Sequence, residues 1–182
     1  MKFREHHPPE VSTIPGRLSR SEALSSIRAL RSKPARPEDA LTRVRDDAIL
    51  TLVAHAAPSA TCIGRLTWGD LGNKELLLDP RRTDEYRIVI ILKILPDLRA
   101  KLTAWRTALA GEIDRDPSLD EPVFPRLPAG RGSQLSPIGG RAAALIVRRR
   151  LLESGVAPER ARAGWLRGSL GLIGAGRRRQ AS

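Results

Sequence analysis

Residues 45–54 read Arg-Asp-Asp-Ala-Ile-Leu-Thr-Leu-Val-Ala, and residues 66–71 read Leu-Thr-Trp-Gly-Asp-Leu. The first stretch is the centre of a predicted helix over residues 38–56, which Pro58 is expected to end. The apolar residues that recur in it at helical spacing are Leu41, Val44, Ala48 and Leu52. We therefore expect a long helix in the core, and we expect Trp68 to be a core residue as well.

The apolar period changes after this stretch. Residues 74–78 and 86–92 predict two strands, joined by the turn-rich residues 79–84. A further helix is predicted from Pro96-Asp97 over residues 97–110, with a core stripe of Leu98, Leu102, Trp105 and Leu109. The predicted fold class is mainly α with a small antiparallel β-sheet (α+β), and the hairpin packs against the two long helices.

The segments before and after this centre are less regular. Residues 1–18 predict a flexible arm, because they contain prolines and no apolar period. Ser19 is a candidate N-cap with Glu22 three residues on, so a helix is expected there. Residues 111–135 predict a long loop rich in proline and glycine. Residues 168–182 read as a basic tail rich in glycine and arginine.

The predicted helix after that loop begins at Ser136-Pro137 and ends near Glu153. Arg141 and Arg148 lie seven residues apart and are expected to share one of its faces. A last helical segment, containing Trp165, is predicted from Pro158. The residues of the first of these helices expected to point inward are Ile138, Ala142, Leu145 and Leu152.

The charge of the chain points to a polyanion as partner. There are 32 Lys and Arg residues against 20 Asp and Glu, a formal net charge of +12, and only five of the 32 are lysine. Guanidinium groups suit bidentate phosphate contacts, although a GC-rich genome explains an arginine bias equally well. Aromatic residues make up only 3% of the chain, which disfavours base stacking on single strands. Duplex DNA is therefore the expected partner.

Other classes of protein and site are disfavoured by the composition. The single cysteine, Cys62, excludes an intramolecular disulfide and a cysteine-rich zinc site, and no metal or cofactor is expected. No apolar run approaches the ~18 residues of a membrane span, and the N-terminus lacks a signal-peptide core. We expect a cytoplasmic protein, associated with the nucleoid if it binds DNA.

The order of these parts resembles the catalytic domain of the tyrosine recombinases, the phage-integrase family, over residues 15–167. That domain opens with a Leu-Thr/Ser-x-x-Glu helix and continues with a stretch similar to residues 45–71. The domain then has a β-hairpin that carries a lysine, followed by a long helix, a Phe-Pro loop and a helix that starts at Leu-Ser. A His-x-Leu-Arg box comes last. The residues that match these later parts in order are 87–92, 98–106, Pro122-Val123-Phe124-Pro125, Leu135-Ser136 and 157–162.

The resemblance also implies where an active site would lie, and the chain departs from the family there. Ser59 stands at the position of the first active-site arginine and Glu159 at that of the box-two histidine. Arg82 falls near the hairpin lysine, and Arg162 falls on the box-two arginine. The sequence ends at Ser182, before the family's tyrosine nucleophile, and its single tyrosine, Tyr86, lies on the predicted hairpin.

These departures bear on strand cleavage, which needs a nucleophile and positive charges around the phosphate in the transition state. Loss of one such donor commonly costs about 10²–10³ in rate. We therefore expect a DNA-binding protein that is catalytically inactive, a truncated remnant, or the product of a reading frame disrupted near residue 150. The residues expected to contact DNA are Arg82, Arg141, Arg148 and Arg162. A basic RNA- or ribosome-associated protein, or an interaction module for an intact recombinase, remains an alternative.

Overall fold

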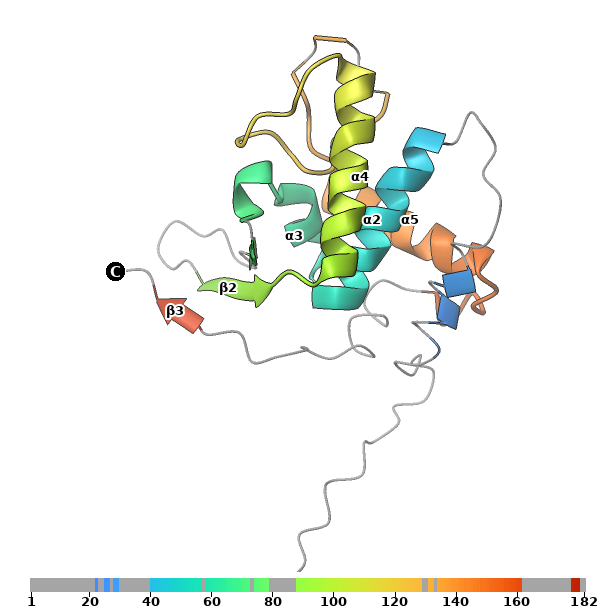
Figure 1. The fold of residues 1–182 in the computed structure, drawn as a ribbon. Helices are drawn as coiled ribbons and strands as arrows, with labels where there is room; N and C mark the ends of the chain where they lie inside the picture. The colour runs from blue at the N-terminus through green and yellow to red at the C-terminus, as the bar shows by residue number, and fades with distance from the viewer. Residues whose placement is uncertain are drawn as a thin grey trace, which may run out of the picture.

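The structure is a computed structural model, and it describes residues 22, 25–26, 28–29, 40–56, 58–72, 74–78, 88–128, 131–132, 134–161 and 178–180. Its elements are, in order, α2 (Ala40–Ala56), α3 (Ala60–Arg65), the 3-10 helix η2 (Trp68–Asp70), β1 (Glu75–Leu78), β2 (Ile88–Lys93), α4 (Pro96–Ile113), α5 (Gly140–Glu153) and β3 (Arg178–Gln180) (Figure 1). The predicted fold class, mainly α with a small antiparallel sheet, is confirmed.

Helices α2 and α4 pack along each other and form the centre of the core (Figure 1). Helix α4 starts at Pro96, whose fixed φ suits a first helical position and whose missing N–H leaves no donor unpaired there. The predicted α4 stripe is confirmed, and the helix adds one further turn. Its buried residues are Leu98, Leu102, Trp105, Leu109 and Ile113. Trp68 is also buried, as predicted.

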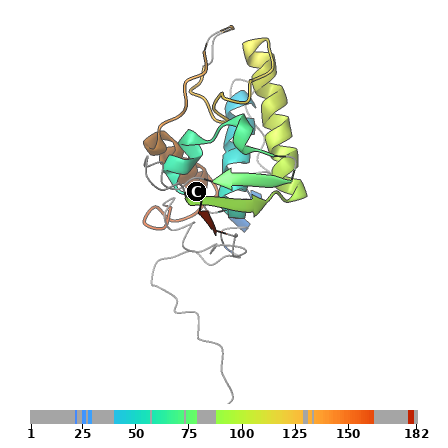
Figure 2. The same cartoon turned by 90° about the vertical axis from the view of Figure 1, so that its left-hand side faces the viewer.

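The predicted hairpin strands pair antiparallel, with Glu75 opposite Lys93 and Leu78 opposite Ile90. Leu76 and Leu78 point into the core, and the sheet lies across the ends of α2 and α4 (Figure 2). His55, near the end of α2, donates its Nε2–H to the backbone oxygen of Lys93 at 2.8 Å, which ties the helix to the sheet.

A third strand was not predicted. β3 pairs antiparallel with β2, with Ile88 opposite Gln180, so the sheet has the order β1-β2-β3. The sequence prediction had assigned residues 178–180 to a basic tail, because three residues are too few to show an alternating pattern. The predicted hairpin turn at residues 79–84 lies outside the described residues.

The loop between α4 and α5 begins at Asp114, three residues later than predicted, because α4 continues to Ile113. Its middle is part of the core, since Val123 and Phe124 are fully buried. The Trp105 indole Nε1–H donates to the Val123 carbonyl oxygen at 2.6 Å, and Val123 N–H donates to the Leu66 oxygen at 2.8 Å. The segment that resembles the Phe-Pro loop of recombinases is therefore fixed between α4 and the end of α3.

Helix α5 corrects the sequence prediction in both its start and its buried face. The helix begins at Gly140 because the residues before it pair with the loop as extended backbone. Ile138 N–H donates to the Phe124 oxygen, and Pro137 forms an isolated antiparallel β-bridge with Pro125. Ile138 is buried as predicted, but Ala142, Leu145 and Leu152 are exposed. The residues that do point inward are Ala143, Val147, Arg150 and Leu151.

The remaining sequence predictions concern the ends of the chain. Residues 22, 25–26 and 28–29 are helical, in agreement with the helix predicted after Ser19. Ser19 itself, the arm at residues 1–18 and Trp165 lie outside the described residues. The division into an arm, a domain over residues 19–167 and a tail stays a prediction. None of the helices in the described part of the chain is long and apolar enough to cross a membrane.

Candidate nucleic-acid interface

Ser59, at the position that the resemblance gives to an active-site arginine, is the N-cap of α3. Its backbone is extended (φ −68°, ψ 155°), and its Oγ accepts a hydrogen bond from the Cys62 backbone N–H at 3.2 Å. The hydroxyl donates in turn to the Sγ of buried Cys62 at 3.1 Å. Both functions of the hydroxyl are therefore used within the first turn of α3, where Ser59 stabilises the helix end.

Close contact at two glycines joins α3 to the start of α5. A Cβ on Gly64 would overlap the backbone oxygen of Ile138, and one on Gly140 would lie 3.2 Å from the backbone of Thr61. The contact places Ser59 and Arg141 on neighbouring elements. Thr61 and Arg141 are both exposed beside it.

Arg65, in the last turn of α3, is an exposed cation that the sequence reasoning missed. Nothing in its local sequence distinguishes it from other polar residues. Its exposure follows from Gly64, which turns the neighbouring face of α3 towards α5. Arg65 and Arg141 are thus two exposed cations on helices that contact each other.

The two arginines predicted to share one face of α5, Arg141 and Arg148, are both exposed. The next two residues behave differently, although the sequence shows an uninterrupted run of three arginines. Arg149 Nη2 lies 2.8 Å from Asp46 Oδ2, and Arg150, only 6% exposed, pairs with Glu153 at 2.5 Å. The run is therefore not a single solvated face: it combines one exposed cation with two that make ion pairs.

Asp46 is the centre of this ion-pair cluster. It is 1% exposed and accepts two hydrogen bonds at one oxygen from Arg45, at 2.9 and 3.1 Å. Its other oxygen faces Arg149 at 2.8 Å and Arg150 Nε at 4.0 Å. Arg150 Nε is buried with no hydrogen-bond partner. One buried carboxylate thus holds α5 on α2, and the surrounding charge is positive.

The other predicted site residues are less fully placed. Glu159 is exposed in the turn after α5, between a half-buried Ala157 and a fully buried Ala161. Its neighbour Arg160 pairs with Glu22 at 3.1 Å. Arg82 and Arg162 lie outside the described residues. The resemblance implies that Ser59, Arg82, Glu159 and Arg162 share one concave surface, and this stays a prediction.

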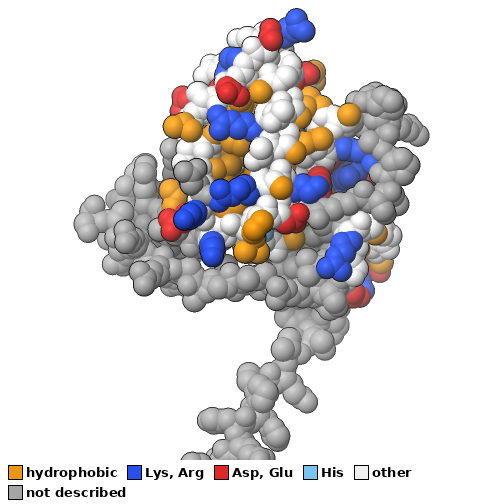
Figure 3. Space-filling model, in the orientation of Figure 1, with side chains coloured by type: hydrophobic (Ala, Val, Ile, Leu, Met, Phe, Trp, Pro, Cys, Tyr) orange, Lys and Arg blue, Asp and Glu red, His pale blue; other side chains and the backbone are white. Residues whose placement is uncertain are grey.

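The face of the molecule that carries α4 has a mixed charge pattern. Lys and Arg side chains are spread across it with Asp and Glu side chains between them (Figure 3). Lys101 on α4, for example, pairs with Asp47 on α2 at 2.7 Å. Among the described residues, no group of three His, Cys, Asp or Glu side chains is placed to hold a metal ion.

Comparison with solved structures identifies the fold. The XerH site-specific recombinase, in a pre-cleavage complex with its difH substrate, superposes with a TM-score of 0.64 over 86% of this chain at 16% identity. The fold is that of the tyrosine recombinases. XerA recombinase gives a TM-score of 0.59 over 90% of this chain at 18% identity. Lambda integrase (residues 75–356) bound to DNA gives 0.52 over 85% at 13% identity.

The likeness to tyrosine recombinases is therefore one of fold. This chain spans 42% of the length of the XerH chain, 50% of XerA and 49% of the lambda integrase chain. No family model matches the sequence. No curated protein matches it by sequence. The resemblance inferred from the order of motifs is thus confirmed at the level of the fold, although the sequence identity is only 13–18%.

Proposed function

We propose that this chain binds duplex DNA through the surface formed by α3 and α5, and that it does not cleave the DNA. The observation that carries the proposal is the tyrosine-recombinase fold, shared with the XerH chain in its complex with difH. The net charge of +12 supports it, because each phosphate contacted by Lys or Arg releases counterions. Arg65, Arg141 and Arg148 are the described residues assigned to this surface, and Arg82 and Arg162 are assigned to it by the resemblance.

The proposal of inactivity rests on Ser59 and Glu159. Where the resemblance places a guanidinium, the chain has a hydroxyl that is already bonded to the first turn of α3. Where it places a histidine, the chain has an exposed carboxylate, which repels a phosphate instead of protonating a leaving oxygen. DNA binding tolerates both changes, because it depends on summed positive charge.

DNA binding is expected to weaken steeply with salt. If about six phosphates are neutralised, the slope of log K against log salt is about −5, with little preference for sequence. Arg141→Gln and Arg148→Gln should each make the slope shallower by about 1. Fluorescence anisotropy with a labelled 30-base-pair duplex measures these slopes.

The matched control is Lys101→Gln, which removes the same charge from α4, where Asp47 already neutralises it. This variant should keep the wild-type slope. Binding that does not respond to salt, or that is absent at about 50 mM salt, contradicts the proposal. Structured RNA that displaces the duplex at equal concentration would favour the alternative of an RNA-associated protein.

No covalent protein–DNA adduct is expected on a suicide DNA substrate, in which a nick traps the phosphotyrosyl intermediate. Denaturing gel electrophoresis of the chain with labelled substrate measures this, and an active tyrosine recombinase on its own substrate serves as the positive control. Ser59→Arg should also give no adduct, because Glu159 still stands at the position of the general acid. A phosphotyrosyl adduct from the wild-type chain would overturn the proposal of inactivity.

A further inference from the structure

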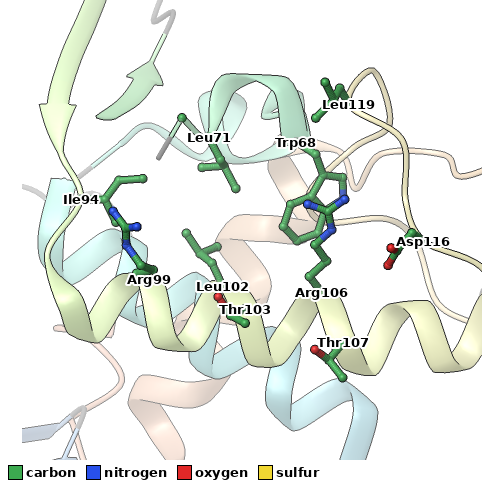
Figure 4. A pocket seen from close by; sticks show the side chains of 11 residues that line it. Trp68, Leu71, Ile94, Arg99, Leu102, Thr103, Arg106, Thr107, Asp116 and Leu119 are labelled. Atoms are coloured by element: carbon green, nitrogen blue, oxygen red, sulfur yellow. The ribbon is translucent and has the colours of Figure 1, made fainter. Parts of the chain in front are cut away.

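A cleft of about 370 Å³ lies beside α4 (Figure 4). We call it the α4 cleft. Its base is one face of α4, formed by Arg99, Thr103, Arg106 and Thr107, which recur at helical spacing and lie beside the core stripe. Trp68 of η2 and Leu119 of the loop after α4 line the cleft from the facing side.

The indole N–H of Trp68 is a donor without an acceptor. Its Nε1 atom is buried and makes no hydrogen bond, and the residue is only 4% exposed. A buried donor that lacks a partner lowers stability, so its presence calls for an occupant. The guanidinium of Arg106 lies over the Trp68 ring, 5.3 Å from the centroid, and donates to the Pro117 oxygen at 3.1 Å.

The wall that carries Leu119 is held in place before any ligand arrives. Gly69 N–H donates to the Leu119 oxygen at 2.6 Å, and Trp68 N–H donates to the Glu121 oxygen at 3.1 Å. The Arg115 guanidinium binds both carboxylate oxygens of Glu121, and this hydrogen bonding lowers the pKa of Glu121 to about 2. The loop is thus fixed across the physiological pH range, although Leu119 itself is 66% exposed at the surface.

The chemistry of the lining indicates one kind of occupant. The lining contains two arginines and two threonines but a single carboxylate, that of Asp116, so the cleft favours an anion. Apolar side chains line it as well, namely Leu71, Ile94, Leu102 and Leu119. A phosphate backbone leaves such a lining unused, whereas a peptide can place an apolar side chain against it and a carboxylate beside the arginines.

We propose that the α4 cleft binds a peptide segment of a partner protein, in which an acidic residue stands next to a leucine-like residue. The carboxylate pairs with Arg106 and draws the guanidinium outward, which opens the Trp68 indole N–H to the same oxygen. The apolar side chain packs against Leu102 and Leu119. This proposal does not depend on DNA binding, because it uses none of the residues assigned to DNA.

The test uses the capped tripeptide acetyl-Leu-Asp-Leu-amide as a probe, with acetyl-Leu-Asn-Leu-amide as its uncharged counterpart. The ¹⁵N–¹H spectrum of the full chain reports the indole N–H signals, and Trp68→Phe assigns the one from Trp68. We expect the Asp peptide to shift this signal in a saturable way. The Trp105 indole signal should stay in place, because that N–H is already bonded to Val123. The Asn peptide should bind at least tenfold more weakly.

Variants separate a specific site from general attraction to a basic protein. Arg106→Gln should weaken binding of the Asp peptide about tenfold or more, whereas Arg126→Gln, which removes an exposed charge outside the cleft, should change it less than twofold. An unmoved Trp68 signal would overturn the proposal, as would equal shifts with the two peptides or equal losses in the two variants. A DNA duplex that shifts the Trp68 signal and displaces the peptide would also overturn it, and would assign the cleft to DNA.

Discussion

Replacing Asp46 with asparagine is expected to lower the free energy of unfolding by about 3–5 kcal/mol. The carboxylate is 1% exposed and faces three guanidinium groups, of which those of Arg45 and Arg150 are themselves buried. The amide keeps the shape of the side chain but removes the charge that compensates these cations. Buried cations left without a counter-charge are costly, because water cannot solvate them. Urea unfolding followed by far-ultraviolet circular dichroism measures the loss.

Asp47→Asn is the matched control for that experiment. Asp47 is the next residue on α2, and it also pairs with a cation, Lys101. The Asp47 side chain is 22% exposed, and the Lys101 side chain is 32% exposed. Its loss should cost no more than about 1 kcal/mol, because water screens the pair. Adding Arg150→Met to the Asp46→Asn variant should recover part of the lost stability, since it removes one of the two buried cations beside Asp46. Equal effects of the two asparagine substitutions would show that burial of the Asp46 cluster contributes nothing.

The helices whose apolar stripe is complete in the sequence could be predicted from it. Helix α4 is the example: Leu98, Leu102, Trp105 and Leu109 are all apolar, all inward, and follow a proline that marks the start. The hairpin strands were predictable for a similar reason, because residues 88–92 are β-branched or leucine without interruption. In α4 and β1 the local pattern and the burial agree.

Helix α5 shows why the rest could not be predicted. Its inward face contains Arg150, and its outward face contains Leu145, which is 55% exposed. A prediction from hydrophobicity alone therefore assigns the wrong face of the helix to the core. Arg150 has two counter-charges: Glu153 of the same helix at 2.5 Å, and Asp46, about a hundred positions earlier in the sequence, at 4.0 Å. No local pattern reveals the second. Tertiary pairing, not propensity, decides the orientation of this helix.

Part of the candidate site could likewise be predicted from the sequence, and part could not. The resemblance places Ser59 at the position of an active-site arginine, because Trp68 and Asp70 fix the alignment nearby, and this assignment stays a prediction. That Ser59 caps α3 agrees with the preference of serine for helix starts. The α4 cleft could not be predicted, because it depends on how the loop after α4 folds back over Trp68. Arg99 and Arg106 are recognisable in the sequence only as residues outside the core stripe.

The same loop makes Trp105 the core residue whose loss should matter most. Trp105→Ala is expected to lower the free energy of unfolding by about 3–5 kcal/mol, because it leaves a large cavity at a fully buried position of α4. It also removes the donor to the Val123 oxygen at 2.6 Å, the bond that fixes the loop on α4. Urea unfolding measures the stability, and amide hydrogen exchange at Val123 and Phe124 reports the loop itself.

Trp105→Phe separates the two contributions, since phenylalanine fills much of the volume but has no N–H. This variant should lose about 1–3 kcal/mol, because the buried Val123 oxygen is left without the indole donor. Exchange at Val123 and Phe124 should accelerate more than exchange in the middle of α2. Leu119→Ala, at a 66% exposed position of the same loop, is the control and should stay within about 0.5 kcal/mol of wild type. If Trp105→Phe matches the wild type in both measurements, packing alone holds the loop, and the hydrogen bond to Val123 does not stabilise it.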